Sequence, residues 1–296
     1  MILRQGLRVF VLLLITSACP LAQANPLLEM VKTVEQRLDA RMGVALYDAA
    51  SGKTWDYHGD DRFPMTSTFK TLACAALLAK ADSGAEDLDQ RVTFGKEALV
   101  TYSPVTETHT GEPGMTLEEL CEATMSTSDN TAANLVLNAL GGPGSVTGFV
   151  RDLGDAITRL DRTETTLNEA TPGDPRDTTT PNAMVHNLRK LVLGNALAAD
   201  SRYKLISWLR GNRVSDNLLR AAIPQEWTIG DRSGAGGHGS RSIAAVLWPP
   251  DRQPLVIAIY ITETDASFDE RNQAIADIGK VVVTWLLCQS AVAVAG

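Results

Sequence analysis

The spacing of apolar residues divides the chain into strands near both ends and helices in the middle. Residues 27–38 carry apolar side chains at helical spacing directly after Pro26, which predicts a helix. Two short apolar runs at 43–47 and 54–57 flank a polar turn and are typical of a β-hairpin. From Ser67 the spacing is helical for about 140 residues. Further strands are predicted at 227–231, 242–248 and 255–262, and a final helix at 268–287.

Capping signals and one long irregular segment divide the helical part of the chain. Thr116 and Glu119 form a capping box that begins one helix, and Gly141 follows the end of another. Helices are predicted at 68–81, from 116 onward, and at 130–140, 181–193 and 201–209. Residues 159–180 have no periodicity, and a loop of that length within a compact domain is usually functional or an Ω-loop.

Strands on both sides of a helical block favour one sheet assembled from the two ends of the chain. We expect an α/β fold with an all-α part: a five-stranded antiparallel sheet flanked by helices, with an inserted helical domain. The α/β subdomain would take residues 25–61 and 210–296, and the helical subdomain 62–209, including the irregular loop. A cleft between two such parts is a common place for a ligand.

The first 24 residues have the pattern of a secretory signal peptide. Arg4 and Arg8 lead into a short apolar run, and the segment ends in Ala22-Gln23-Ala24, an A-x-A cleavage pattern. The apolar run is too short to cross a bilayer, which needs about 20 residues. A lipoprotein site at Cys19 is the weaker alternative, because no large aliphatic residue stands three positions before it. We expect cleavage after Ala24, a periplasmic location and no membrane contact afterwards.

Composition and charge exclude several classes of protein. The 296 residues are 44% hydrophobic and 21% charged, which is ordinary for a globular domain and excludes a disordered chain or a small disulfide scaffold. The formal net charge of −8, from 27 basic and 35 acidic residues, argues against nucleic acid as a partner. Four histidines fall in no metal-binding pattern, so we expect no metal and no cofactor: His58, His109, His186 and His238.

Export changes what the cysteines can do, because two of them can pair in an oxidising compartment. Cleavage of the signal would leave Cys74, Cys121 and Cys288. Cys74 and Cys121 lie on neighbouring predicted helices, whereas Cys288 lies close to the C-terminus. We therefore favour a Cys74–Cys121 bridge; the alternative is that all three are reduced.

Three short motifs contain residues suited to nucleophilic chemistry. Ser67 and Lys70 stand three residues apart at the start of a helix, which places an amine one turn from a hydroxyl that needs activation. The apolar run after Lys70 indicates a buried, partnered amine. Ser128-Asp129-Asn130 begins another helix, and Arg232-Ser233-Gly234 follows a predicted strand. Taken alone, each motif is better explained as a cap or a turn.

Taken together, the three motifs resemble the S-x-x-K, S-D-N and K-T-G signature of serine β-lactamases and penicillin-binding proteins, with arginine in place of lysine in the third. Within the irregular loop, Glu164-Thr165-Thr166-Leu167-Asn168 looks like the E-x-x-L-N motif of class A β-lactamases. Arg162 and Asp177 resemble the ion pair that closes this loop in the family. Cys74 and Cys121 stand at the positions of the family's disulfide.

The resemblance implies catalytic roles for six residues. Ser67 attacks the lactam carbonyl, and the backbone N–H groups of Ser67 and Ala235 hold the developing oxyanion. Lys70 and Glu164, the latter through a water, are both candidates for the base in acylation. Ser128 passes a proton to the leaving nitrogen. Glu164, positioned with Asn168, then activates the water that releases the product.

The resemblance also implies a set of substrate-binding residues. The substrate carboxylate would lie against Arg232, Ser233, Arg241 and Ser128, and the family motif continues through Gly234. Asn130 and the backbone of Ala235 would orient the amide of the substrate side chain, with Tyr102 at the rim. Arginine at 232 resembles the R-[ST]-G form of the carbenicillin-hydrolysing subgroup. The alternative is that this arginine is neutral for substrate preference.

We therefore expect an exported, monomeric class A serine β-lactamase that hydrolyses penicillins, including carboxypenicillins, and confers resistance. Two other functions stay open. A penicillin-binding D,D-peptidase or a β-lactam sensor would share Ser67, Lys70 and Ser128, but should lack Glu164 and Asn168 at this spacing. An exported anion-binding protein would use the arginines alone, with Ser67 incidental.

Overall fold

The computed structural model describes residues 25–295, with side chains as far as residue 287, so the predicted signal peptide and the side chain of Cys288 lie outside what is described. Five strands form one antiparallel sheet in the order β2-β1-β9-β8-β7. Their bounds are Arg41–Asp48 (β1), Lys53–Tyr57 (β2), Thr228–Ala235 (β7), Arg241–Trp248 (β8) and Leu255–Thr262 (β9). The predicted sheet assembled from both chain ends is confirmed, since β1 pairs with β9.

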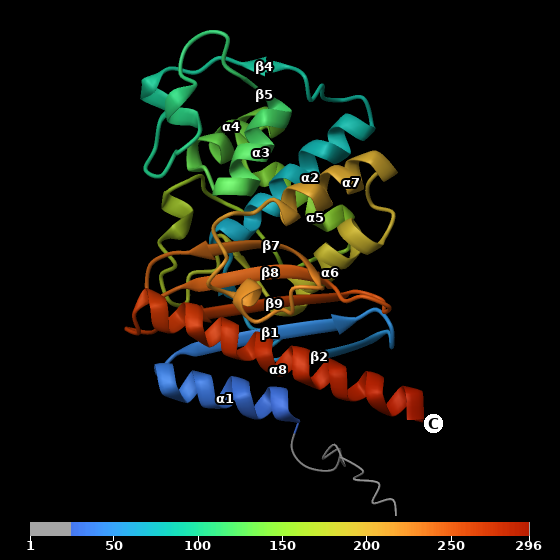
Figure 1. The fold of residues 1–296 in the computed structure, drawn as a ribbon. Coiled ribbons are helices and arrows are strands. Elements are labelled where there is room, and N and C mark those ends of the chain that lie inside the picture. Colours follow the sequence, from blue (N-terminus) through green and yellow to red (C-terminus); the bar gives the residue numbers. More distant parts are fainter. Residues whose placement is uncertain (1–24, 296) are drawn as a thin grey trace, which may run out of the picture.

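Two terminal helices cover one face of this sheet (Figure 1). They are α1, Pro26–Leu38, and α8, Phe268–Ala295. Side chains of a strand alternate between the two faces. In β8, Ile243, Ala245 and Leu247 therefore pack with these helices, while Ala244 and Val246 pack on the opposite side. Because both faces are covered, β8 and β9 are almost continuously buried rather than alternating in exposure.

The remaining helices pack on the other face and extend away from it (Figure 1). They are α2 (Phe69–Asp82), α3 (Leu117–Thr127), α4 (Asn130–Leu140), α5 (Pro143–Asp152), α6 (Pro181–Leu188) and α7 (Ala199–Arg210). Helix α2 is central, with contacts to α3, α4, α5 and α7, and its residues 69–78 are all buried. Its residues 72–78 are all apolar, as expected for a helix segment that is covered on every side. The expected disulfide is confirmed: Cys74 on α2 is bonded to Cys121 on α3.

Short elements connect these helices and strands. Four two-residue strands form two pairs: β3 (Phe63–Pro64) with β6 (Thr178–Thr179), and β4 (Arg91–Val92) with β5 (Met115–Thr116). Short helical turns are η1 (Thr66–Thr68), η2 (Lys96–Ala98), η3 (Thr106–Thr108), η4 (Thr166–Asn168), η5 (Arg189–Leu193) and η6 (Leu219–Ala221). Of the helices in the described part of the chain, none has the length and apolar character needed to span a membrane.

Several predicted boundaries were wrong. Helix α2 begins at Phe69, one residue after the predicted start, and Ser67 lies in the preceding 3₁₀ turn η1. The helix predicted at 181–193 ends at Leu188 and continues as a single π turn. Strand β7 continues past the predicted end to Ala235, and α5 was not predicted. The two-subdomain division stays a prediction, which the presence of a separate core on each face of the sheet supports.

Candidate active site

Most of the predicted site residues line one cavity of about 310 Å³ beside strand β7. Its walls are Ser67, Tyr102, Ser128, Asn130, Asn168, Val214, Arg232, Ser233, Gly234, Ala235, Arg241 and Phe268. Lys70 and Glu164 are buried directly behind this wall, where they contact its residues. A larger hollow of about 660 Å³, near Tyr47 and Pro254, lies at the opposite end of the strands and contains none of the predicted residues.

Lys70 is wholly buried, and its ammonium group is surrounded by oxygen atoms. It donates to Ser128 O at 2.8 Å, Ser128 Oγ at 3.1 Å and Asn130 Oδ1 at 2.7 Å. It also forms an ion pair with Glu164 Oε1 at 3.1 Å. Burial lowers the pKa of Lys70 to about 8, and the charge of Glu164 opposes this shift. The partnered amine expected from the sequence is confirmed.

The turn that carries Ser67 is held in an unusual backbone conformation. Thr66 has φ of 45°, which a β-branched residue rarely adopts and which costs on the order of 1–3 kcal/mol. Its hydroxyl donates to Met65 O at 2.7 Å and lies 2.7 Å from Ser242 Oγ on β8. These buried hydrogen bonds tie the turn to the sheet and so fix Ser67 at the wall of the cavity.

Gly234 allows strand β7 to pass very close to this turn. A Cβ atom at Gly234 would lie 2.0 Å from Thr66 Oγ1 and 2.5 Å from Ser67 N. Neither contact is possible for a real side chain, so only glycine fits here. The close approach also brings the next residue, Ala235, to the same cavity wall as Ser67.

The segment at Ser128 is fixed by its neighbour Asp129. Ser128 ends α3 with φ of 65°, and the Asp129 carboxylate caps α4 by accepting from Ala132 N at 2.8 Å. The same carboxylate accepts from the N–H groups of Val105 and Thr106, both at 2.9 Å. Asp129 therefore has the capping role that its sequence position predicts, and it ties this segment to the neighbouring loop.

Asn130 joins the same loop to the buried amine. Its backbone N–H donates to Tyr102 O at 3.0 Å, and its Nδ2 donates to Thr101 O at 2.8 Å. The Asn130 Oδ1 atom accepts from Lys70. Tyr102, at φ of 66°, is half-exposed at the cavity, which is the rim position expected for it.

Glu164 and Asn168 face each other across one turn of the irregular loop. Asn168 Nδ2 donates to Glu164 Oε2 at 2.5 Å. The backbone of Glu164 is held by both ends of the Asn134 amide, with distances of 2.8 and 2.9 Å. Sequence analysis did not identify Asn134, since it lies within α4 and no motif marks it. The result is a buried carboxylate with a fixed orientation.

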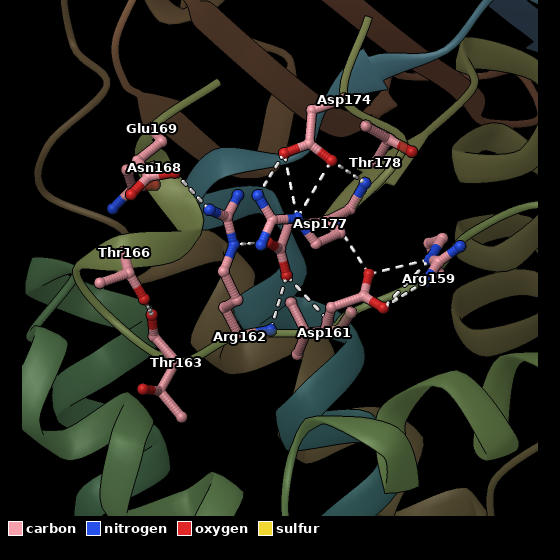
Figure 2. Close-up of polar contacts among 12 residues, drawn as sticks. Arg159, Asp161, Arg162, Thr163, Thr166, Asn168, Glu169, Asp174, Asp177 and Thr178 are labelled. Carbon is pink, nitrogen blue, oxygen red and sulfur yellow. Dashed lines mark hydrogen bonds and ion pairs between the residues drawn. The ribbon is translucent and has the colours of Figure 1, made fainter. Parts of the chain in front are cut away.

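Asp177 closes this loop at its base (Figure 2). Its Oδ2 pairs with Arg162 Nε at 2.6 Å, and its Oδ1 accepts from the backbone N–H groups of Asp161 and Arg162. Arg162 also reaches Glu169 at 2.5 Å. The ion pair predicted between Arg162 and Asp177 is confirmed. The two ends of the loop are therefore held together by a buried carboxylate.

Two buried arginines supply positive charge to the cavity. Arg232 donates from Nε to Ser233 O and from Nη1 to Met125 O. Arg241 donates from Nη1 to Gly234 O and from Nε to Asn272 Oδ1, both at 2.8 Å. Burial lowers the pKa of each guanidinium to about 10, so both stay charged at neutral pH.

Asn272 and Phe268 were missed by the sequence analysis. Asn272 orients Arg241, and the ring of Phe268 lies 4.8 Å from the Arg241 guanidinium in a cation–π contact. Both come from α8, far from every motif in the sequence.

Across the described residues, no group of three or more potential metal ligands is present.

Taken together, a serine on a strained turn, a buried lysine, a buried carboxylate and a cationic cavity define a serine hydrolase site. Comparison with known proteins gives the same class. Residues 26–286 match the family model described as the beta-lactamase enzyme family. The chain is 53% identical to Beta-lactamase AER-1 of Aeromonas hydrophila over 86% of this chain and 84% of that one. It is 50% identical to Beta-lactamase PSE-4 of Pseudomonas aeruginosa over 88% of this chain and 90% of that one.

Solved structures agree with these relatives. An ancestral (GNCA) class A beta-lactamase superimposes with a TM-score of 0.86 at 54% identity, covering 87% of this chain and 99% of that chain. The chromosome-encoded beta-lactamase of Vibrio parahaemolyticus superimposes with a TM-score of 0.85 at 47% identity, covering 88% of this chain and 98% of that chain. The chain therefore belongs to the beta-lactamase enzyme family. Within that family it is a class A serine β-lactamase, an enzyme that hydrolyses β-lactams.

Proposed function

We propose that Ser67 is the nucleophile of this β-lactamase and that its oxygen attacks the lactam carbonyl. The observation that carries the proposal is the chain of contacts from Glu164 through Lys70 to Ser128 and Asn130, directly behind the cavity that Ser67 lines. Attack forms a bond from Ser67 Oγ to the carbonyl carbon, and the lactam C–N bond then breaks. Ser128 delivers its proton to the nitrogen and regains one from Lys70 across their 3.1 Å contact. Lys70 in turn receives, across its ion pair, the proton that Glu164 took from Ser67, so Glu164 is again a carboxylate in the acyl-enzyme.

Glu164 takes the proton of Ser67 through a water in our proposal, while Lys70 stays protonated at neutral pH. Lys70 has four oxygen atoms within 3.1 Å, which is an environment for an ammonium because that group only donates. A pKa of about 8 leaves the protonated form dominant at pH 7. Neutral Lys70 is the competing base, and it becomes available only as the pH rises.

Deacylation uses the same carboxylate. Glu164 Oε1 and Asn168 Oδ1 are buried oxygens for which the described residues supply no hydrogen-bond donor, apart from the Lys70 ion pair on Oε1. Two such acceptors are suited to a water molecule, which can donate to both. Glu164 would remove a proton from this water as it attacks the acyl carbonyl, and that proton would then pass to Ser67 Oγ as the C–O bond breaks.

The substrate is held by charge at one end of the cavity and by its amide at the other. Arg232, Arg241, Ser233 and Ser128 surround the position proposed for the carboxylate, and the backbone N–H groups of Ser67 and Ala235 form the oxyanion hole. Asn130 and Ala235 orient the side-chain amide, with Tyr102 at the rim. Arginine at 232 presents a planar fork, and we propose that this favours carboxypenicillins.

The Glu164–Asn168 hydrogen bond favours hydrolysis over the rival functions. A D,D-peptidase or a β-lactam sensor would acylate the serine without a carboxylate placed to activate water. The buried Lys70 ion pair also argues against a simple anion-binding protein, which would have no use for it. We further propose that the protein is exported after cleavage at Ala24 and acts as a periplasmic monomer.

Substitution of the proposed nucleophile tests this mechanism. Ser67→Ala should abolish turnover of a chromogenic cephalosporin and leave no covalent adduct in an intact mass spectrum. Ser83→Ala, at the exposed C-terminal end of α2, is the matched control and should turn over normally. Hydrolysis at the wild-type rate by Ser67→Ala would mean that another group attacks the ring.

A further inference from the structure

A buried polar network lies behind Arg232. Asn212, in the loop after α7, donates from Nδ2 to Asp231 Oδ1 at 2.5 Å and accepts at Oδ1 from Arg232 Nη1 at 3.2 Å. Asp231 also accepts from Ser215 and forms an ion pair with Arg220 at 2.7 Å. Asn212, Asp231 and Arg232 each have an exposed fraction of 4% or less. A single amide therefore connects the buried carboxylate to the arginine of the cavity.

The chemistry of its neighbours fixes the orientation of the Asn212 amide. The carboxylate of Asp231 only accepts hydrogen bonds, and the guanidinium of Arg232 only donates them. The NH₂ group must therefore face Asp231 and the oxygen must face Arg232. An apolar side chain at 212 would satisfy neither neighbour, whereas an ionised aspartate would place two carboxylates in contact.

The network also sets the charge that reaches the cavity. Arg220 and Arg232 each carry a positive charge and Asp231 a negative one, so a neutral residue at 212 leaves one net positive charge. Arg220 is held behind Asp231, where it also donates to the backbone carbonyls of Leu209 and Arg210. The uncompensated charge is therefore that of Arg232, which lines the cavity.

Asn212 completes the set of acceptors that fix the guanidinium plane. Nε of Arg232 donates to Ser233 O at 3.0 Å, and Nη1 donates to Met125 O at 2.9 Å as well as to Asn212. Among the side chains described, as far as residue 287, Nη2 has no hydrogen-bond partner, so it is the remaining nitrogen that can meet an anion. Loss of the Asn212 contact would remove the one side-chain acceptor that holds this arrangement.

We propose that Asn212 is a positioning residue: it holds Arg232 in place for the substrate carboxylate and keeps the network positive on the cavity side. The inference rests on the proposed role of Arg232 in binding that carboxylate. Because the contact acts on a group that binds ground state and transition state alike, its loss should appear mainly in KM.

Three variants test the proposal with a penicillin as substrate. Asn212→Leu keeps the size but removes the hydrogen bonds with Asp231, Arg232, Ser215 and the backbone N–H of Val214. It should raise KM about tenfold with kcat changed less than about threefold. In Asn212→Asp the new carboxyl group can donate a hydrogen bond to Asp231 only while it is protonated. The ratio of the KM of this variant to that of the wild type should therefore rise with pH. Ser215→Ala is the matched control: it removes hydrogen bonds to Asp231 and to the NH₂ group of Asn212 but leaves the Asn212 oxygen on Arg232. It should lower Tm but leave KM within about twofold.

The outcomes separate this inference from the function on which it rests. If both Asn212 variants keep KM within twofold of the wild type from pH 5 to pH 9, Asn212 does not position Arg232. If Ser215→Ala raises KM as much as Asn212→Leu, the amide acts only through general stability, and the proposal is overturned. Arg232→Gln is measured beside them. An unchanged KM in that variant would instead contradict carboxylate binding by Arg232 itself.

Discussion

Lys70 Nζ and Glu164 Oε1 lie 3.1 Å apart, and neither side chain is exposed to solvent. Removing one partner of a buried ion pair is costly, on the order of 3–5 kcal/mol, because the other charge is left without compensation. The charge of Glu164 raises the pKa of Lys70 and so favours its protonated form. The proposed catalytic cycle depends on this coupling, and two predictions follow from it directly.

Glu164→Gln should trap the acyl-enzyme. The amide keeps the shape of the side chain but cannot deprotonate the deacylating water, so release should slow by about 10²–10⁴-fold. Acylation should continue, because loss of the Glu164 charge lowers the pKa of Lys70 further and frees its amine to act as a base. Intact mass spectrometry after mixing with a penicillin should show an adduct of one whole penicillin.

The matched control for this variant is Glu169→Gln, which changes a half-exposed carboxylate in the same loop. This enzyme should turn over without accumulating an adduct. Normal turnover by Glu164→Gln, with no adduct, would rule out Glu164 as the group that activates water.

The activity of the wild-type enzyme should fall as the pH rises through about 8. A lysine whose pKa is lowered to about 8 loses its proton in this range, and the site then loses the charge that holds Glu164 and Ser128. The measurement is kcat/KM for a penicillin between pH 6 and pH 10. A rise through pH 8 would instead identify neutral Lys70 as the base in acylation.

Arg232→Lys should selectively impair carboxypenicillins. A lysine keeps the charge but loses the planar fork, so kcat/KM for carbenicillin should fall about tenfold while that for benzylpenicillin changes little. Arg210→Lys, at the exposed end of α7, is the control and should leave both substrates unaffected. Equal losses on both substrates would show that Arg232 provides only general anion binding.

Asp177→Asn should loosen the loop that carries Glu164. The substitution weakens the ion pair with Arg162 in a buried position, which should cost about 2–4 kcal/mol in the free energy of unfolding and slow deacylation. Urea unfolding and acyl-enzyme lifetime measure the two effects. Asp174→Asn, whose partner Arg176 is exposed, is the control and should change neither. An unaltered lifetime in Asp177→Asn would separate loop closure from catalysis.

Local sequence signals predicted most of the helices and strands but not all of the residues at which they begin and end. Strand β7 continues to Ala235 because its pairing with β8 extends to Arg241, although the residues involved are polar or small and give no apolar pattern. Helix α5 buries only Val146 and Val150, so its apolar face is too narrow to be recognised. In both cases pairing or packing with distant residues determined the structure.

The prediction of the site residues was restricted in the same way, to residues that local signals mark. Ser67, Lys70 and Glu164 were identified because they stand in motifs with fixed spacing. Asn212 and Asn134 were not, since each is a single amide whose partner comes from a different element of the fold. Nothing in the local pattern around such a residue distinguishes it from an ordinary exposed asparagine. Only the folded arrangement reveals the contact.

The pairing of β1 with β9 has a consequence for biosynthesis. Strand β8, which pairs with the strand that carries Arg232, has its other neighbour in β9, and β9 in turn pairs with the first strand of the chain. Such a topology has high contact order and closes late during folding. A ribosome-bound chain therefore holds no complete site until β9 and the start of α8, which supplies Phe268 and Asn272, have emerged. The enzyme is catalytically silent until synthesis is nearly finished.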